Sequence, residues 1–463
     1  MFEEFINFKK NIINNCTECG TCFKYCYAYK RTKFPIWKHW KDFFQTGEKS
    51  KEIKKFIKAC IYCKYHEYAC PNNIKLTELL PALRNDLSHI YPRFAWTPHI
   101  LPGFLGRFLR TRRLYSFWRY MNNLLIPEKE REKWDFRRKP QKREVVFFSG
   151  CGIQLLPDLY YSQLEILEKL GIDYGLIEGH YNRAVCCGTV LFLLGNYKYG
   201  KKVLINLINE IKKYKTKKVI IHCPTCNWGL TQIAPNIIED FDLEVIHAST
   251  YIGDLLKKNP KLKKMLKIPD KEIVLTIHDS CHLARAGDVN GIRNLLSQLP
   301  GTSISEMNHN KLNAICDLYC ILRAFPHRPL DIVLNNNNIP ISKEAIEANA
   351  DILVSICLGC HALQSLFGQN FISTFIKRKR QIPLINWTSI LAKYLGLKTR
   401  HGLNYWLKHI ITIPFKDSLS FWILNAIKAL IYGYLLNRIP PIRIPNYLKK
   451  QNYNNLDENL KNR

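Results

Sequence analysis

The stretch that decides the fold runs from Val145 to Cys226. It opens with VVFFSGC, residues 145–151, and thirty-four residues separate Cys151 from the sequence Cys186-Cys187-Gly188. Thirty-five residues then separate Cys187 from Cys223, the first cysteine of HCPTC, which ends at Cys226. Neighbouring side chains of a regular strand face opposite ways, but a glycine permits a tight turn. The adjacent cysteines can therefore turn toward one site, and soft thiolates there select iron–sulfur clusters, zinc or cuprous copper.

Five cysteines share this spacing, one more than an ordinary cluster or a structural zinc ion takes. A zinc site with one spare thiol is the plain alternative. The order and spacing resemble the cysteine-rich CCG domain of heterodisulfide reductases and related iron–sulfur oxidoreductases. The resemblance implies a noncubane [4Fe–4S] cluster, and with it the catalytic chemistry, on Cys151, Cys186, Cys187, Cys223 and Cys226.

The pattern then repeats. KEIVLTIHDSC ends at Cys281 and is followed by Cys316, each 130 residues after its counterpart in the first unit. ADILVSICLGC supplies Cys357 and Cys360, each 134 residues after its counterpart. A nearly fixed offset indicates an internal duplication. Both halves have the strand and helix pattern of an α/β fold with a parallel sheet, and their cysteines lie where buried strands end.

The second unit departs from the first, because Asp317 stands where the first has Cys187. The four cysteines could hold a further cluster with Asp317 as a harder oxygen ligand, or Asp317 could be a cap or surface residue. Cys320 is expected to be a small buried hydrophobe. Four histidines near the cysteines could tune potentials by hydrogen bonds or be structural: His222, His278, His282 and His361.

Residues 1–90 carry two ferredoxin-type runs. The first has the C-x2-C-x2-C-x3-C spacing, and the second has His66 at its third position and ends in Cys-Pro. The last cysteine of each such run ligates the other cluster. One cubane would then use Cys16, Cys19, Cys22 and Cys70, and the other Cys60, Cys63 and Cys26, with His66 at the remaining iron.

His66 allows two interpretations. It could ligate a histidine-bound or three-iron cluster of altered potential, or it could face solvent beside a degraded site. The segment between the two runs is long and has a helical pattern, which favours an all-helical dicluster domain over a small ferredoxin fold.

Two segments indicate partners. Residues 91–143 are a basic helical linker in which Lys and Arg far outnumber Asp and Glu, typical of a membrane-surface or partner-docking helix. A linker helix that packs on the chain's own domains is the alternative. Residues 397–463 form an amphipathic tail in which Ser418 to Leu436 is almost uncharged. That stretch is borderline for a span, which needs about 20 apolar residues. An interfacial helix, docking on a partner and a true span remain open.

The 463 residues carry a formal net charge of +31 and seventeen cysteines, all but Cys320 at motif positions. The N-terminus lacks an apolar signal region, which favours a reducing cytoplasm where clustered cysteines bind metal. The charge implies acidic partners. With no nucleic-acid motif in the sequence, we expect no nucleic-acid partner and favour the inner face of the cytoplasmic membrane or a partner subunit.

The expected fold is α+β and multidomain: a helical dicluster domain, the linker, two duplicated α/β units at 144–268 and 269–396, and the tail. The whole resembles the iron–sulfur subunits of membrane-bound heterodisulfide reductases and of anaerobic glycerol-3-phosphate dehydrogenases. One function that this implies is an enzyme whose clusters carry electrons to the noncubane cluster, where a disulfide is reduced, with a cytochrome b partner. The other is an electron-transfer and anchoring subunit between a flavoprotein and quinone.

Overall fold

We analysed a computed structural model of the chain. It describes residues 10, 12–24, 26–46, 50–74, 132–150, 156–178, 185–193, 197–317, 338–365 and 382–399. Cys151, Cys320, the linker before residue 132 and the tail from residue 400 lie outside the described residues. The predictions made for them therefore rest on sequence alone.

The described part of the N-terminal region is helical and has no strand. Short helices alternate with the cysteine loops: η1(Thr21–Phe23), α2(Tyr27–Thr32), η2(Ile36–Lys38), α3(Trp40–Thr46), α4(Lys51–Ala59) and α5(Tyr65–Ala69). The Ser50 hydroxyl caps α4 by accepting a hydrogen bond from the Ile53 amide. Aromatic rings fill the core, where Trp40 stacks on Phe44 at 5.4 Å between ring centroids. These side chains fix the loops that carry the cysteines.

The first cysteine-rich unit is built on a four-stranded parallel sheet in the order β2-β1-β3-β4. The strands are β1(Val145–Phe148), β2(Tyr174–Ile177), β3(Lys218–Ile221) and β4(Glu244–His247). All four residues of β1 are buried, as expected of a central strand covered on both faces. The helices are α11(Pro157–Lys169), α12(Thr189–Leu193), α13(Tyr197–Lys212), α14(Pro224–Trp228), α15(Ala248–Lys258) and α16(Pro260–Lys263).

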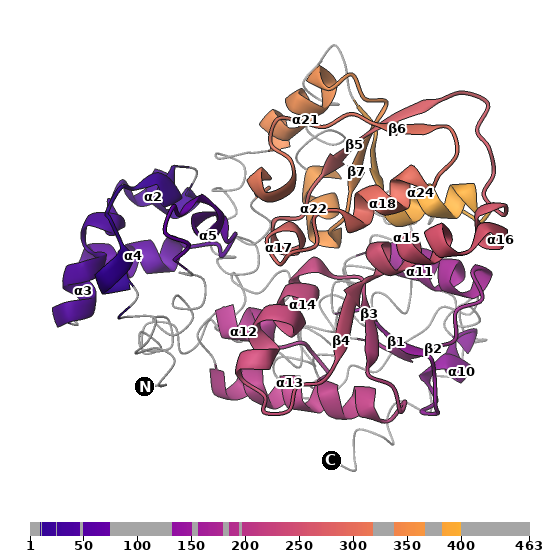
Figure 1. Cartoon of the computed structure of the whole chain (residues 1–463), viewed down its shortest axis with the longest axis horizontal. Coiled ribbons are helices and arrows are strands. Elements are labelled where there is room, and N and C mark those ends of the chain that lie inside the picture. The colour runs from indigo at the N-terminus through magenta and orange to yellow at the C-terminus, as the bar shows by residue number, and fades with distance from the viewer. Residues whose placement is uncertain are drawn as a thin grey trace, which may run out of the picture.

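The second unit repeats this topology, with the parallel order β6-β5-β7-β8. Its strands are β5(Ile273–His278), β6(Thr302–Ile304), β7(Ile352–Ser355) and β8(Leu384–Asn386), and its helices are α17(Cys281–Ala284), α18(Gly291–Ser297), η7(Lys311–Asn313), α21(Asn338–Glu347), α22(Leu358–Leu363) and α24(Trp387–Tyr394). The predicted combination of helices with parallel α/β sheets is confirmed. Figure 1 shows the two units one above the other, with the N-terminal helices at one side.

Equivalent helices of the two units pack on each other. α11 and α15 of the first unit contact α24 and α18 of the second, respectively. The contact is reciprocal, because α11 corresponds to α18 and α15 to α24 in strand order. One hydrophobic cluster runs through all four helices and includes Leu164, Ile252, Leu295 and Leu391, each fully buried. The two units therefore share a core.

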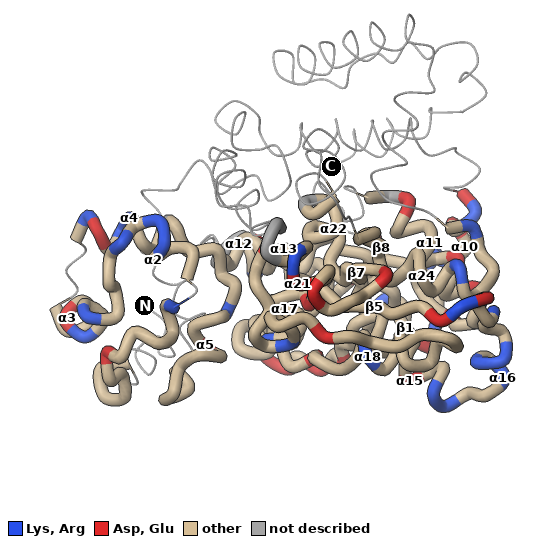
Figure 2. The backbone as a smooth tube through the Cα atoms, turned by 90° about the horizontal axis from the view of Figure 1, so that it is seen from above, with Lys and Arg blue, Asp and Glu red and all other residues tan. Residues whose placement is uncertain are grey.

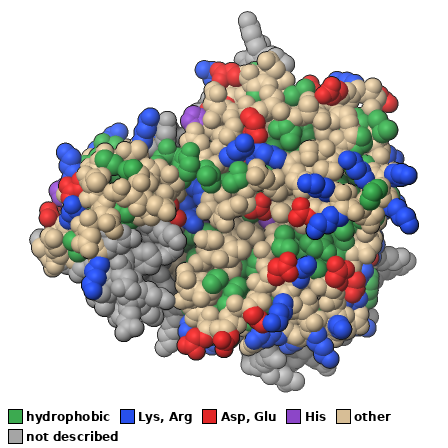
Figure 3. Space-filling view, viewed as in Figure 1, with side chains coloured by type: hydrophobic (Ala, Val, Ile, Leu, Met, Phe, Trp, Pro, Cys, Tyr) green, Lys and Arg blue, Asp and Glu red, His purple; other side chains and the backbone are tan. Residues whose placement is uncertain are grey.

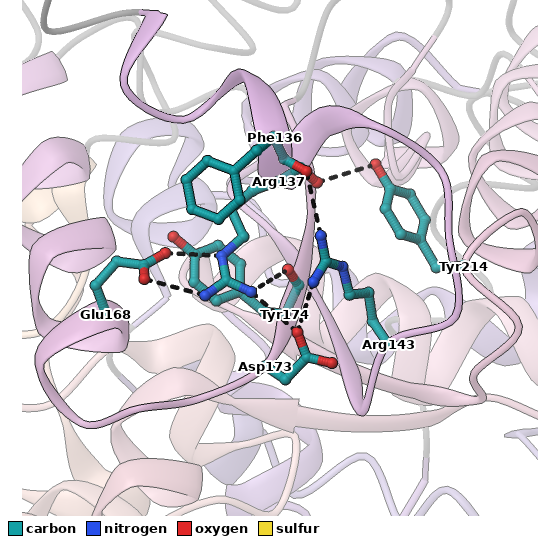
Figure 4. A network of polar contacts seen from close by, with 7 residues as sticks. All are labelled: Phe136, Arg137, Arg143, Glu168, Asp173, Tyr174 and Tyr214. Atoms are coloured by element: carbon teal, nitrogen blue, oxygen red, sulfur yellow. Dashed lines mark hydrogen bonds and ion pairs between the residues drawn. The ribbon is translucent and has the colours of Figure 1, made fainter.

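The end of the basic linker is tied to the first unit by ion pairs (Figure 4). Arg137, on α10(Asp135–Arg138), donates from Nε to Glu168 at 2.8 Å and from Nη1 to Asp173 at 3.0 Å. Arg143 reaches the same Asp173 oxygen at 2.7 Å. Arg138 pairs with Glu178 at 2.9 Å. These three arginines have internal partners, so they add little to an attraction for an acidic surface.

Positive charge is spread over the described parts of the chain. Figure 2 shows Lys and Arg along α4, α10 and α16 with Asp and Glu between them. On the face in Figure 3, basic side chains are scattered among acidic and apolar ones.

Among the described residues, no helix is long and apolar enough to cross a membrane.

Candidate metal centres

The four described cysteines of the first unit converge where its strands end. Cys186 and Cys187 follow β2 along the chain, and Cys223 and Cys226 lie at the start of α14, just after β3. The backbone at Gly150 closes the group, since a Cβ there would lie 3.1 Å from the Cys226 Sγ. Gly150 also has a φ of +68°. This glycine brings the chain against the C-x-x-C thiols one residue before Cys151.

The adjacent pair turns as the sequence required. Gly188 has a φ of +72°, and a Cβ there would lie 2.6 Å from the Gly200 carbonyl oxygen. The Gly188 amide donates to the Cys186 sulfur at 3.4 Å, and the Thr189 hydroxyl donates to the Cys187 sulfur at 3.2 Å.

Hydrogen bonds from the Cys186 and Cys226 thiols and from Thr189 hold the pKa of Cys187 well below its ordinary value. The thiolate is the form that binds metal. The site fits an iron–sulfur group in its donor chemistry, because buried thiols cluster there around a stabilised thiolate.

The second unit places its cysteines in the same way but with different neighbours. Cys357 and Cys360 flank the start of α22, and hydrogen bonding with Cys316 together with burial raises the pKa of Cys281. Asp317 is only 1% exposed, which rules out the surface interpretation. Its carboxylate, the His278 imidazole and the Cys360 sulfur lie within 4.8 Å of one another.

The four cysteines predicted for the first cubane surround one pocket. Cys16, Cys19, Cys22 and Cys70 line it together with Gly20 and Trp37. Burial and the neighbouring thiolates of Cys70, Cys16 and Cys19 raise the pKa of Cys22 to about 12. Mutual repulsion of thiolates at one point is what a bound cation relieves, so the pocket fits the expected cluster in its donors.

The side chains of the second ferredoxin-type group are more buried than those of the first. Burial raises the pKa of Cys26, and the nearby Cys60 and Cys63 thiolates raise it further. This places the fourth cysteine of the first run with the second run. His66, on α5, is 6% exposed, so the solvent-facing interpretation is wrong. Burial lowers the pKa of His66 to about 4, which keeps its imidazole neutral, the form that binds metal.

One histidine joins three of these groups. His282 follows Cys281, and its Nε2 lies 2.8 Å from the Tyr62 carbonyl oxygen, between Cys60 and Cys63. Because a carbonyl only accepts, Nε2 donates and Nδ1 accepts from the Thr225 hydroxyl at 2.9 Å. Thr225 lies between the two cysteines of the first unit's C-x-x-C. The loop between Cys60 and Cys63, the C-x-x-C loop of the first unit and the loop that follows β5 therefore meet at the His282 imidazole.

Arg285 reinforces this junction. Its guanidinium donates to the carbonyl oxygens of Cys63, Leu312 and Ala314, the second of these at 2.9 Å. Its charge also lowers the pKa of Cys63, against the larger effect of burial, which raises it. Sequence reasoning did not assign Arg285. The only signal was its place in HDSCHLAR, one turn after Cys281.

The other histidines near cysteines have local partners. His361 Nδ1 lies 2.8 Å from the Ser355 hydroxyl. His222 stacks on Trp387 at 5.6 Å between ring centroids, and its Nδ1 lies 3.3 Å from the Gln163 amide oxygen. Burial lowers the pKa of His222 to about 3. Both are part of the packing between strands and helices.

Comparison with known proteins agrees with this geometry. Residues 145–231 and 275–363 match the profile of the cysteine-rich domain family, CCG. The chain therefore carries two CCG domains in tandem, one on each sheet. It is 25% identical over 422 residues to a subunit of the dihydromethanophenazine:CoB–CoM heterodisulfide reductase of Methanosarcina mazei, a match that covers 84% of this chain and 95% of that protein.

Two further relatives define the range of functions. The same heterodisulfide reductase subunit from Methanosarcina acetivorans is 27% identical over 83% of this chain and 94% of its own length. The glycolate oxidase iron–sulfur subunit of Escherichia coli is 22% identical over 79% of this chain and 93% of its own length. These relatives are iron–sulfur subunits of multisubunit oxidoreductases. The chain is accordingly a protein of the iron–sulfur oxidoreductase class.

Proposed function

We propose that this chain is the subunit of an oxidoreductase complex at which a disulfide is reduced, with the first CCG domain as the reactive site. The observation that carries the proposal is the hydrogen-bonded group of Cys186, Cys187 and Cys226, closed by Gly150. Its stabilised thiolate and its five-cysteine sequence pattern suit a noncubane [4Fe–4S] cluster, completed by Cys151 and Cys223. Such a cluster, when bound, supplies electrons one at a time and an iron that can accept a thiolate.

The rest of the chain would deliver electrons to that site. Two ferredoxin-type [4Fe–4S] clusters would be held by Cys16, Cys19, Cys22 and Cys70, and by Cys26, Cys60, Cys63 and His66. The contact from Tyr62 through His282 to Thr225 holds the second of these groups against the first CCG domain. Reduction of a disulfide takes two electrons and two protons and releases two thiols. The disulfide between coenzymes B and M, named for the methanogen relatives, is the first substrate to try.

The test is a viologen assay on anaerobically purified protein. Reduced methyl viologen should be reoxidised when the coenzyme B–coenzyme M heterodisulfide or another low-molecular-weight disulfide is added. Cys187→Ser should abolish that turnover and lower the iron content by about four atoms. Cys320→Ser is the matched control, since this cysteine lies outside every motif. Full disulfide-dependent activity in Cys187→Ser would move the reaction away from the first CCG domain.

An electron-transfer subunit that serves a flavoprotein is the second candidate. It is favoured by the similarity to the glycolate oxidase subunit. Such a subunit should reduce a quinone analogue when a flavoprotein partner supplies electrons, and it should show no turnover with disulfides. The same viologen assay, run with disulfide and quinone in parallel, separates the two functions.

We also place the protein at the inner face of the cytoplasmic membrane, on the basis of its net charge of +31 and the apolar stretch from Ser418 to Leu436. Both the stretch and most of the basic linker lie outside the described residues. Full-length protein should float with anionic vesicles, and salt should weaken the binding because exposed charges are screened. A chain that ends after Gly402 should stay in the soluble fraction with its iron content unchanged. Equal flotation of both forms would contradict the proposal.

A further inference from the structure

Arg285 links the second CCG domain to the second ferredoxin-type group. It follows α17 directly, and each of its three guanidinium nitrogens donates to a backbone carbonyl oxygen. Nη1 binds the Cys63 carbonyl across the interface, while Nε binds that of Leu312 at 2.9 Å and Nη2 that of Ala314 at 2.6 Å. In the opposite direction, the Lys64 Nζ donates to the Arg285 carbonyl oxygen at 3.4 Å. Side chains from both parts of the chain therefore hold the backbone of the other part.

These contacts leave the positive charge of Arg285 free to act on its surroundings. All three carbonyl partners are neutral, and an arginine does not lose its proton in a protein. Arg293, by contrast, pairs with two carboxylates. Burial raises the pKa of Cys63, hydrogen bonding with Cys316 and burial raise that of Cys281, and the charge of Arg285 opposes both effects. Arg285 therefore favours negative charge on sulfur on either side of the interface.

The second ferredoxin-type group is buried enough to respond to this charge. Cys60 is 8% exposed and His66 is 6% exposed, whereas Cys19 of the first group is exposed. Buried charges are screened much less than exposed ones. Net charge and solvent exposure help to set the potential of an iron–sulfur centre, and a nearby positive charge stabilises an added electron. An electron should therefore be held more firmly at the second group than at the first.

The contact of Arg285 with Cys63 crosses between two parts of the chain, so its effect must be reciprocal. If Arg285 stabilises the reduced form of the second group more than the oxidised form, reduction must strengthen the contact by the same free energy. Reduction adds one electron, supplied by a one-electron donor such as the redox partner. The reduced protein should then hold the loop from Cys60 to Tyr65 more firmly against the second CCG domain.

We propose that Arg285 couples the redox state of the second ferredoxin-type cluster to the docking of the N-terminal region on the second CCG domain. This inference rests on the part of the proposed function that assigns this cluster to the second group. The donors there fit such a cluster, since buried thiols lie beside a neutral imidazole. The hydrogen bonds of His282 that join this loop to the first CCG domain would be held most firmly while the electron is present.

The test compares Arg285→Gln and Arg285→Lys with wild type, as full-length proteins purified without air. Glutamine removes the charge, whereas lysine keeps the charge but lacks the planar fork of donors. Native-state hydrogen exchange of residues 60–65 is measured after reduction with dithionite and after oxidation with thionine. In wild type and in Arg285→Lys, exchange should be about tenfold slower in the reduced protein, toward the low end of the range for coupled sites. In Arg285→Gln this difference between the redox states should vanish.

A redox titration followed by EPR gives an independent measurement. By the same cycle, a tenfold effect corresponds to about 59 mV for a one-electron step. The potential of one ferredoxin-type cluster should therefore fall by about 59 mV in Arg285→Gln and stay unchanged in Arg285→Lys. Lys263→Gln is the matched control, because it also removes one positive charge, but from an exposed side chain hydrogen-bonded to Gln298 at 3.2 Å. It should change neither the potential nor the exchange.

Equal exchange in oxidised and reduced wild type would overturn the proposal, and this comparison stands even if a variant fails to fold. A redox difference in exchange that persists in Arg285→Gln would overturn it as well. Potential shifts of equal size in Arg285→Gln and Arg285→Lys would assign the effect to the hydrogen bonds and would contradict the role of the charge. Neither measurement uses a disulfide or depends on Cys187, so failure here is distinguishable from failure of the proposed reaction.

Discussion

The Nε2 atom of His282 lies 2.8 Å from the carbonyl oxygen of Tyr62, although 220 residues separate them. His282 is 3% exposed, and its ring lies 4.9 Å from that of Trp228. Trp228 in turn packs in the hydrophobic cluster of the N-terminal region with Phe56. The N-terminal region and both CCG domains therefore meet at a buried polar contact surrounded by aromatic rings.

His282→Leu should loosen this contact. It removes two hydrogen bonds and leaves the Tyr62 carbonyl and the Thr225 hydroxyl buried without their partner, which costs about 2 kcal/mol. Opening of the loop from Cys60 to Tyr65 should become roughly 30-fold more frequent. Native-state hydrogen exchange of the amides in that loop measures the change.

The matched control for this experiment is His309→Leu. His309 is bound to Glu344 at 2.6 Å, a contact within the second domain. Its loss should leave exchange in residues 60–65 unchanged. His282→Gln, which can restore one of the two hydrogen bonds, should lie between wild type and His282→Leu. Wild-type exchange in His282→Leu would show that the aromatic packing alone holds the regions together.

Stability in acid should depend on the pair of Arg293 and Glu306. Arg293 donates to Glu306 at 2.6 Å, and this hydrogen bond holds the pKa of Glu306 below its ordinary value. The pair therefore stabilises the fold fully above the unfolded pKa of about 4.3, and the stabilisation is lost as the pH falls through the lower folded pKa. Glu306→Gln should be less stable than wild type at pH 7, and the difference should shrink below about pH 4.3.

Urea unfolding of both proteins at pH 7, 5 and 4 checks this dependence. Lys343→Gln is the control, because Lys343 forms an exposed pair with Glu347 at 3.5 Å and such pairs add little. A difference between Glu306→Gln and wild type that grows as the pH falls would contradict the assigned direction.

The sequence predicted the sheets and the cysteine groups because both depend on local patterns. Runs such as VVFF are buried on both faces and leave few alternatives to a parallel sheet, while cysteine spacing carries its own signature. The docking of the parts was not predictable. His278, Asp317 and Cys360 come from three separate segments, and only the folded second domain shows that they converge.

Surface alternatives for His66 and Asp317 failed for a related reason. Each stands at a motif position normally held by cysteine, and the fold buries the residue that replaces it. At the described end of the basic linker, Arg137, Arg138 and Arg143 are bound to carboxylates of the first domain, as the alternative of a linker packed on its own domains expects.

His66→Cys should lower the potential of the second ferredoxin-type cluster. Imidazole ligation raises the potential of an iron–sulfur centre relative to thiolate, and His66 is buried at a cysteine's spacing from Cys63. A redox titration followed by EPR should show one cluster shifted to lower potential. His39→Cys adds a cysteine to the same region, where His39 stacks on Phe34 at 4.7 Å between ring centroids, and should shift none. Unchanged potentials in His66→Cys would place His66 away from the iron.

Two glycines have the same backbone conformation, so a comparison of their alanine variants separates the effect of crowding at the first CCG site from the effect of backbone strain. Gly150 and Gly171 have φ angles of +68° and +69°. An added Cβ would lie 3.1 Å from the Cys223 Cβ and the Cys226 Sγ at Gly150, and would meet nothing within 4 Å at Gly171. Both alanine variants should lose about 1–2 kcal/mol of stability, because the left-handed conformation is unfavourable with a side chain.

Only Gly150→Ala should also disturb the metal site, since its methyl group pushes against the C-x-x-C thiols. We expect it to lower the iron content by about four atoms and to abolish disulfide-dependent oxidation of viologen. Gly171→Ala should keep both the iron and the activity at the wild-type level. Iron determination on the two variants, purified side by side without air, decides the matter. A Gly150→Ala protein with its full iron content would mean that the segment leading to Cys151 can move away from Cys226 without cost to the cluster.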